Sequence, residues 1–178
     1  MFALKICGYP NLDTALAQFS PTHVISAITD MPALPGVGRH LRVNFHDVAS
    51  PLDGYVHPQM NHIDQVFAFT ADLVETDRLL IHCFAGQSRS TALAIGVLIQ
   101  HGLAPDQAFD HVAAIRACLL PNQLIIRLID QRLRLGGALE RRIANHHEGF
   151  MLTPRHKPTN APNAADVAWM RAMIGFVR

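Results

Sequence analysis

The sequence has little cysteine, little charge and no long hydrophobic run, and each shortage excludes a class of protein. Its 178 residues include 3 cysteines, an odd number too small for a disulfide framework, which indicates a reducing compartment. Charged residues make up 16% of the chain and the formal net charge is +1, so we expect no nucleic-acid partner. The longest apolar run, residues 91–99, falls well short of the roughly 20 residues that span a membrane.

The sequence also offers no sign of a signal peptide or of a metal site. Residues 1–13, MFALKICGYPNLD, contain one lysine and no small-residue cleavage site, so they predict a first strand and a cytoplasmic protein. The chain has 11 histidines, but no cysteine pair accompanies them at zinc-finger spacing, and His146 and His147 lack the helical His-x3-His spacing. We therefore expect neither a metal nor another cofactor.

Short apolar runs alternate with helical stretches, which predicts an α/β domain with a central, mostly parallel sheet of four to five strands flanked by helices. The expected strands are residues 4–7, 23–28, 41–45 and 79–83. The expected helices are residues 12–19, 57–73, 89–101, 105–117, 121–135 and 138–145. Pro58 suits the first turn of the second helix.

The C-terminal part of the chain changes in composition. Residues 153–163 hold three prolines and two asparagines, which predicts a linker, and residues 164–177 carry an apolar stripe at helical spacing. We therefore expect a catalytic domain over residues 1–150 and a linker with a C-terminal helix over residues 151–178. The sequence does not indicate an oligomeric state.

The stretch IHCFAGQSRS, residues 81–90, is the most informative segment. A strand that ends at Cys83, followed by a glycine-containing loop and a helix near Ser88, can turn several backbone N–H groups toward one anion. The same positive field favours a thiolate on Cys83, and Arg89 can hold two phosphate oxygens with its planar guanidinium. A strand-end cysteine is more often inert packing, but His82, Cys83, Gly86 and Arg89 rarely occur together by chance.

This loop resembles the His-Cys-x5-Arg-Ser motif of the cysteine-based protein tyrosine and dual-specificity phosphatases. A weaker similarity extends over residues 5–144, and the short chain resembles a compact, bacterial-type member with a phosphotyrosine protein phosphatase-like fold. The resemblance implies Cys83 as the nucleophile, Arg89 as the phosphate binder, Ser90 as the hydroxyl that assists thiolate departure, and His82 as a hydrogen-bonding support of the loop. It implies that the phosphate-binding backbone comprises Phe84, Ala85, Gly86, Gln87, Ser88 and Arg89.

An enzyme of this type also needs an acid to protonate the leaving oxygen. Asp47 is the first candidate, because it follows the expected strand over residues 41–45, where the family carries its general acid. Asp53 is the second candidate, because Pro51 and Gly54 beside it also predict a loop, although a plain turn residue explains Asp53 as well.

The expected activity is hydrolysis of a phosphorylated protein, or of a small aryl phosphate, through a phosphocysteine intermediate. Phe84, Ala85 and Gln87 stand where phosphoinositide phosphatases of the family often carry lysines, which favours phosphotyrosine, with phosphoserine and phosphothreonine left open. Two alternatives come from other classes. A non-catalytic phosphate-binding module would have lost the nucleophile or the arginine, and a rhodanese-like sulfurtransferase or arsenate reductase would use a different cysteine loop.

Overall fold

The computed structural model describes residues 1–152. The chain divides into two compact units, Met1–His147 and Glu148–Arg178, and the first contains the sheet and the helices that cover it. The expected linker over residues 153–163 and the expected helix over residues 164–177 lie outside the described residues.

A four-stranded parallel sheet forms the centre of the fold, in the order β1-β4-β2-β3. The register aligns Gly8 with Cys83 and Ser26 with His82, so the carboxyl ends of neighbouring strands meet at one edge of the sheet. Ligand sites of parallel sheets lie at this edge. The strands are β1 (Ala3–Gly8), β2 (His23–Ser26), β3 (Arg39–Arg42) and β4 (Arg78–Cys83).

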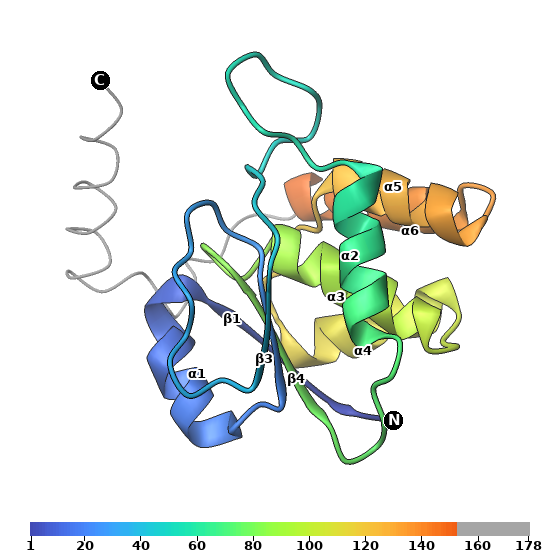
Figure 1. The fold of residues 1–178 in the computed structure, drawn as a ribbon. Coiled ribbons are helices and arrows are strands. Elements are labelled where there is room, and N and C mark those ends of the chain that lie inside the picture. Colours follow the sequence, from blue (N-terminus) through green and yellow to red (C-terminus); the bar gives the residue numbers. More distant parts are fainter. Residues whose placement is uncertain (153–178) are drawn as a thin grey trace. The chain divides into compact units, whose positions relative to one another are not determined.

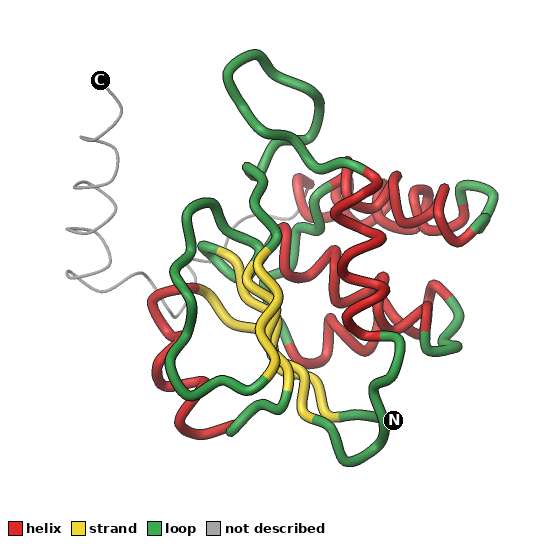
Figure 2. Tube along the Cα trace, in the orientation of Figure 1, coloured by secondary structure: helices red, strands yellow, loops and turns green. Residues whose placement is uncertain are grey.

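Helices cover both faces of the sheet, as Figures 1 and 2 show. One face packs α1 in a small apolar cluster that includes Leu12, Ala15, Val24 and Leu80. The opposite face holds the main core, to which the other helices contribute buried side chains. The helices are the short 3-10 helix η1 (Tyr9–Asn11), α1 (Leu12–Phe19), α2 (Met60–Thr70), α3 (Arg89–Gln100), α4 (Pro105–Ile115), α5 (Gln123–Leu133) and α6 (Ala138–Leu152).

Helix α3 is the element that fixes the site to the core. Ten of its residues, Arg89 to Leu98 in sequence, are buried. Gly96 allows this burial, because a Cβ there would stand 2.6 Å from Cδ1 of Ile129 on α5. The first turn of α3 therefore has a fixed position beneath the end of β4.

The fold class is as predicted, but several expected boundaries are wrong. The third strand covers residues 39–42 instead of 41–45, because β2 ends at Ser26, whose carbonyl accepts a last hydrogen bond from the N–H of Val43 at 3.0 Å. Val43 and Phe45 still point into the core, where both are fully buried. The carbonyl of Phe45 accepts a hydrogen bond from Arg89 Nη1 at 3.0 Å instead of pairing in the sheet.

Local hydrogen bonds explain the helix boundaries that differ from the expected ones. Helix α2 begins after Pro58, because the N–H of Gln59 donates to Nδ1 of His62 at 3.0 Å. Helix α5 begins at Gln123, because the Asn122 side chain caps it by accepting from the N–H of Ile125. Helix α6 was expected to end at residue 145, and it runs to Leu152.

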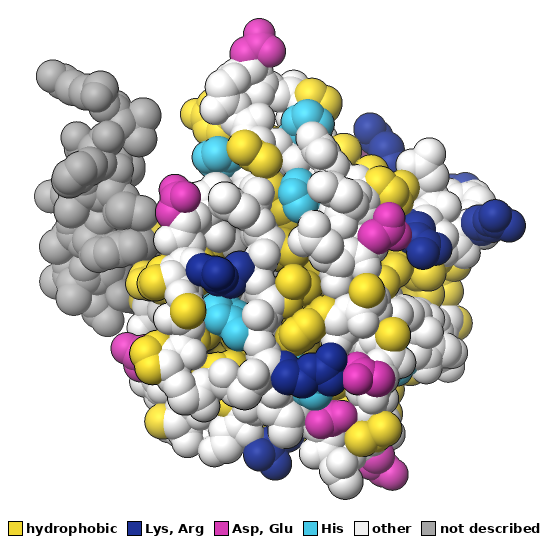
Figure 3. Space-filling model, in the orientation of Figure 1, with side chains coloured by type: hydrophobic (Ala, Val, Ile, Leu, Met, Phe, Trp, Pro, Cys, Tyr) yellow, Lys and Arg dark blue, Asp and Glu magenta, His cyan; other side chains and the backbone are white. Residues whose placement is uncertain are grey.

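Acidic and basic side chains are interspersed on the face drawn in Figure 3, in agreement with the small net charge of the sequence. Among residues 1–152, no helix is both long and apolar enough to cross a bilayer.

Candidate active site

Cys83 is the last residue of β4, and the loop over residues 84–88 joins it to α3. The side chain is 1% exposed. Its Sγ accepts a hydrogen bond from the N–H of Gly86 at 3.2 Å and lies 3.2 Å from Oγ of Ser90. The loop therefore curls around the sulfur, and a hydroxyl from the first turn of α3 reaches the same atom.

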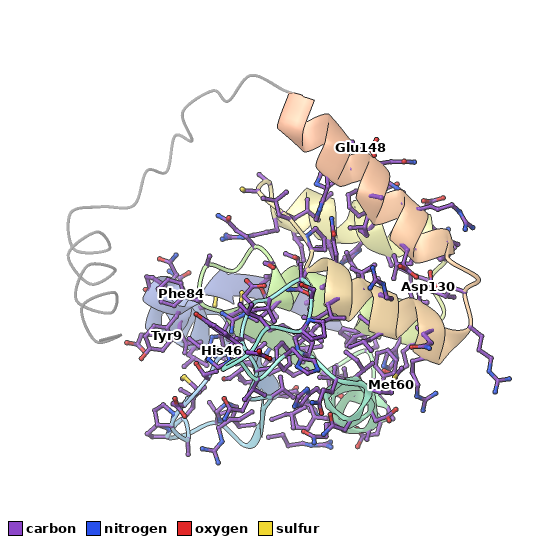
Figure 4. The ribbon with its side chains drawn as sticks, turned by 90° about the horizontal axis from the view of Figure 1, so that it is seen from above. Tyr9, His46, Met60, Phe84, Asp130 and Glu148 are labelled. Carbon is purple, nitrogen blue, oxygen red and sulfur yellow. The ribbon has the colours of Figure 1, made fainter. Side chains whose placement is uncertain are left out.

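The conformation of the loop requires glycine at residue 86. The φ angle of Gly86 is +69°, and a Cβ there would stand 2.5 Å from both the carbonyl carbon of Cys7 and the nitrogen of Gly8. The loop thus lies directly on the end of β1, where Tyr9 N–H also donates to the carbonyl of Phe84 at 2.9 Å. Figure 4 shows Tyr9 and Phe84 beside each other, with Asp130 on the opposite side of the view.

Arg116, at the end of α4, holds the outer side of the same loop. Its Nε donates to the carbonyl of Gly86 at 2.8 Å, and its Nη2 donates to the carbonyl of Ala85 at 3.0 Å. In a trans peptide the carbonyl points away from the next N–H. Holding these two carbonyls outward therefore turns the N–H groups of Gly86 and Gln87 toward the sulfur.

Arg89 is 6% exposed, and its guanidinium is only partly paired. Nη1 donates to the carbonyl of Phe45 at 3.0 Å, while Nε lies 3.7 Å from Oδ2 of Asp47. Nε is buried and has no hydrogen-bond partner among residues 1–152. A buried guanidinium nitrogen of this kind calls for an acceptor, and a phosphate oxygen is the acceptor that suits it.

Asp47 lies beside the loop and is partly exposed. Its Oδ1 accepts hydrogen bonds from Oγ of Ser88 at 2.7 Å and from Nδ2 of Asn122 at 2.8 Å. The same Asn122 amide donates to the carbonyl of Val48 at 3.1 Å, so the cap of α5 also holds the backbone after Asp47. The carboxylate is thus tied to the loop and to Arg89.

Asp53 lies in a different environment. Every residue from 50 to 56 is exposed, including Leu52 and Tyr55. His46 and Val56 join the two ends of this exposed loop. The N–H of His46 donates to the carbonyl of Val56 at 2.7 Å, and Nδ1 of His46 accepts from the N–H of Val56 at 3.0 Å. Asp47, not Asp53, is the carboxylate that the fold brings to the cysteine loop.

His82 is fully buried and hydrogen-bonded away from the loop. Its Nε2 lies 2.5 Å from Oγ of Ser26 on β2, so the ring links two neighbouring strands. Burial first, and the nearby His40 second, lower the pKa of His82 to about 4. The imidazole beside Cys83 is therefore neutral at pH 7.

Sequence reasoning missed Arg116 as a contact of the loop, and it treated Asn122 only as part of a helix start. Arg116 lies about 30 residues after the carbonyls that it binds, and no motif marks it. Within residues 1–152, no group of three or more histidine, cysteine or acidic side chains is placed to hold a metal ion.

The chain was compared with known proteins. No protein-family model matches it. It is 25% identical over 114 residues to a probable dual specificity protein phosphatase of Dictyostelium discoideum. The match covers 63% of this chain and 27% of that protein. It is also 25% identical over 119 residues to dual specificity protein phosphatase 1 of Arabidopsis thaliana, over 63% of this chain and 55% of the relative. The chain therefore spans about a quarter and about half of the lengths of these two relatives.

The fold comparison agrees with the sequence comparison. The crystal structure of human DUSP28 matches with a TM-score of 0.59 at 21% identity, over 80% of this chain and 94% of that chain. The chain is therefore similar in sequence to dual specificity protein phosphatases, and it shares its fold with human DUSP28.

Proposed function

We propose that this chain is a cysteine-dependent protein phosphatase that hydrolyses phosphotyrosine, with phosphoserine and phosphothreonine as further substrates. The observation that carries the proposal is the position of Cys83 Sγ, which meets the Gly86 N–H and the Ser90 hydroxyl at 3.2 Å each. A sulfur that meets a backbone N–H and a hydroxyl at the start of a helix is placed to act as a nucleophile. The names of the sequence relatives supply the substrate class.

The first chemical step is transfer of the phosphoryl group to sulfur. The Cys83 thiolate attacks phosphorus, an S–P bond forms, and the bond from phosphorus to the substrate oxygen breaks. Asp47 gives its proton to that oxygen, so the substrate leaves as a neutral hydroxyl compound. The products of this step are a phosphocysteine and an ionised Asp47.

The second step returns the enzyme to its starting state. A water molecule attacks phosphorus, Asp47 takes a proton from it, and the S–P bond breaks to give inorganic phosphate and the thiolate. The Ser90 hydroxyl, at 3.2 Å from Sγ, donates to the departing sulfur and makes it a better leaving group. Atoms and charge balance without a metal or a redox partner.

The N–H groups from Phe84 to Arg89 form the proposed cradle for the phosphate oxygens, and two features support it. Arg116 holds the carbonyls of Ala85 and Gly86 on the outer side, and Arg89 Nε is buried without a partner among the described residues. An oxygen bound there would accept from backbone and guanidinium together. Both sets of donors exist before the substrate arrives, so little reorganisation is needed in the transition state.

The loop side chains favour a protein or aryl phosphate over a polyphosphorylated headgroup. Phe84, Ala85 and Gln87 carry no charge, so the loop itself offers no cation for a second phosphate. We also propose that catalysis needs only residues 1–150, since every residue assigned here lies in the unit Met1–His147. The three free cysteines fit a cytoplasmic location.

Hydrolysis of para-nitrophenyl phosphate, followed by phosphotyrosine and phosphoserine peptides, tests the proposal. We expect turnover that vanadate inhibits, and an acid-quenched reaction should retain phosphate on Cys83, detected by mass spectrometry of the peptide over residues 79–89. Phosphate binding without turnover would instead identify a non-catalytic module. Turnover without a labelled Cys83 would contradict the covalent mechanism.

A further inference from the structure

Three side chains from three neighbouring strands form a hydrogen-bonded chain behind Cys83. Oγ of Ser26 lies 2.7 Å from Nε2 of His40 and 2.5 Å from Nε2 of His82. Ser26 and His82 are fully buried, and His40 is half-buried on β3. We propose that His40 and Ser26 are positioning residues that fix the tautomer of His82, the residue before Cys83, with its proton on Nδ1.

The sheet register explains why these residues meet. Ser26 pairs with His82 across β2 and β4, and His40 pairs with Val24, two residues before Ser26 on β2. Positions two residues apart on a strand lie on the same face of the sheet. His40 therefore reaches Ser26 diagonally, and Ser26 reaches His82 directly.

Both rings are neutral near pH 7, so each carries one proton. Burial is the first cause that lowers the pKa of His40, and the charge of Arg42 is the second. Burial and His40 lower the pKa of His82 to about 4, and Arg89 adds to this effect. The direction of donation along the hydrogen bonds from His40 through Ser26 to His82 then depends on which nitrogen of each ring bears its proton.

Leu34 sets that direction. Its backbone N–H, which can only donate, points to Nδ1 of His40 at 3.4 Å, so this nitrogen bears a lone pair. The proton of His40 is therefore on Nε2 and is donated to Ser26 Oγ. The Ser26 hydroxyl donates in turn to Nε2 of His82, which leaves the proton of His82 on Nδ1.

The other arrangements are unfavourable. The reverse direction would place a proton on Nδ1 of His40, opposite the N–H of Leu34. Donation from both rings to Ser26 would leave the Ser26 hydroxyl hydrogen without an acceptor among residues 1–152, because the two rings are the partners of its Oγ there.

The consequence is local to the nucleophile. His82 directly precedes Cys83 at the point where β4 ends and the loop begins. A change of tautomer would change the hydrogen bond that holds the His82 ring to Ser26, and with it the position of the end of the strand. We therefore expect the reactivity of the Cys83 thiol to respond to the Ser26 hydroxyl on the neighbouring strand β2. This consequence rests on the proposed role of Cys83, whereas the tautomer itself does not.

Long-range ¹H–¹⁵N NMR of the full chain reports the tautomer directly, with the His82 signals assigned by their loss in His82→Gln. In the wild type we expect Nδ1 of His82 to be protonated and Nε2 to carry the lone pair. In Ser26→Ala we expect Nε2–H to become populated. The control is Thr22→Val, which removes a hydroxyl 2.8 Å from Nδ1 of His23 at the other end of β2 and should leave His82 unchanged.

A wild-type protein with the proton on Nε2 of His82 would overturn the proposal. So would a Ser26→Ala spectrum in which His82 matches the Thr22→Val control. If Ser26→Ala does not fold, His40→Phe takes its place. Loss of the His40 donor weakens the hydrogen bond between Ser26 and His82, so the His82 resonances must still shift. Unchanged resonances in that variant would equally exclude a role for His40.

Alkylation of Cys83 by iodoacetamide at pH 7 gives the second readout and needs no substrate. We expect the rate to fall about three-fold or more in Ser26→Ala and to stay at the wild-type value in Thr22→Val. An equal rate in both variants would remove the link to the nucleophile. If the protein instead fails to hydrolyse any phosphate ester, the proposed function fails, while the NMR result still decides the tautomer.

Discussion

The two loops that meet at the site are built in different ways. The loop over residues 84–88 follows β4, and β1, α3 and Arg116 hold its backbone on several sides. The loop over residues 46–58 follows β3, and its tip, residues 50–56, is exposed throughout. It is closed at its base by His46 and Val56 and joined to the site by the side chain of Asp47.

This difference matches two different chemical tasks. Stabilising charge in a transition state needs donors that are already in place, because reorganising them would cost much of the gain. Delivering a proton to leaving groups of varied size needs a carboxyl group that can adjust, and a segment with few buried contacts opens at low free-energy cost. In the proposed mechanism the cysteine loop would bind the anion, and the loop that carries Asp47 would deliver the proton, its side-chain hydrogen bonds exchanging as the substrate binds.

Cys83→Ser should have the largest effect, because it removes the nucleophile and leaves the rigid loop intact. We expect turnover below about one per cent of the wild type, since a hydroxyl is a far weaker nucleophile than a thiolate. Binding of phosphate or tungstate, measured by calorimetry, should persist. Residual turnover above that level would show that catalysis does not depend on the sulfur.

Arg89→Lys should be nearly as damaging, although the charge is kept. A lysine cannot donate to the carbonyl of Phe45 and to a phosphate oxygen in one plane, as the guanidinium with Nη1 at 3.0 Å from that carbonyl can. We expect kcat/KM to fall by about three orders of magnitude. Near-normal kinetics in this variant would mean that Arg89 only holds the Phe45 backbone.

Asp47→Asn should test the adaptable loop. We expect kcat to fall by roughly two to four orders of magnitude on an alkyl phosphate and much less on a nitrophenyl ester, whose leaving group needs little protonation. Asp53→Asn is the matched control in the exposed tip, and the opposite pattern in these two variants would move the acid to residue 53.

A pair of glycines compares the two loops directly. Gly86 and Gly54 have φ angles of +69° and +80°, so alanine is strained at both, but only at Gly86 would the new Cβ meet backbone, at 2.5 Å. We expect Gly86→Ala to lower kcat/KM about 10- to 100-fold and the free energy of unfolding by about 2–4 kcal/mol. Gly54→Ala should cost about 1 kcal/mol and little activity. Chemical denaturation and kinetics of both variants check this.

Local patterns in the sequence predicted the local parts of the molecule. The helix over residues 12–19 has the predicted bounds, and α3 begins at Arg89, because spacing and loop glycines are signals carried by neighbouring residues. The choice between Asp47 and Asp53 was left open, because both follow the same strand in the same type of loop. The contacts of Asp47 with Ser88 and Asn122 separate the two, and its role as the acid remains a prediction.

The contacts around the site that sequence reasoning did not find are long-range. Asn122 meets Asp47 across 75 residues, and His82 meets Ser26 across 56. These meetings depend on the strand order β1-β4-β2-β3, in which the fourth strand lies between the first two. No periodicity in the sequence encodes that order, so a partner such as Arg116 cannot be recognised before the fold is known.

Arg116→Gln should give the smallest effect, because it loosens the cysteine loop without removing any group that touches substrate. The variant loses two charge-assisted hydrogen bonds to the carbonyls of Gly86 and Ala85, at 2.8 and 3.0 Å. We expect KM to rise about ten-fold with a smaller change in kcat, since the amide cradle becomes less ordered while Cys83 and Asp47 stay in place.

Arg141→Gln is the matched control, because Arg141 Nη1 also binds a loop carbonyl, that of Gly136 at 3.2 Å, far from Cys83 in the sequence. Steady-state kinetics of the two variants should separate them. Equal KM values would show that β1 and α3 alone keep the loop rigid, and the contrast between the two loops would then rest on their burial and not on Arg116.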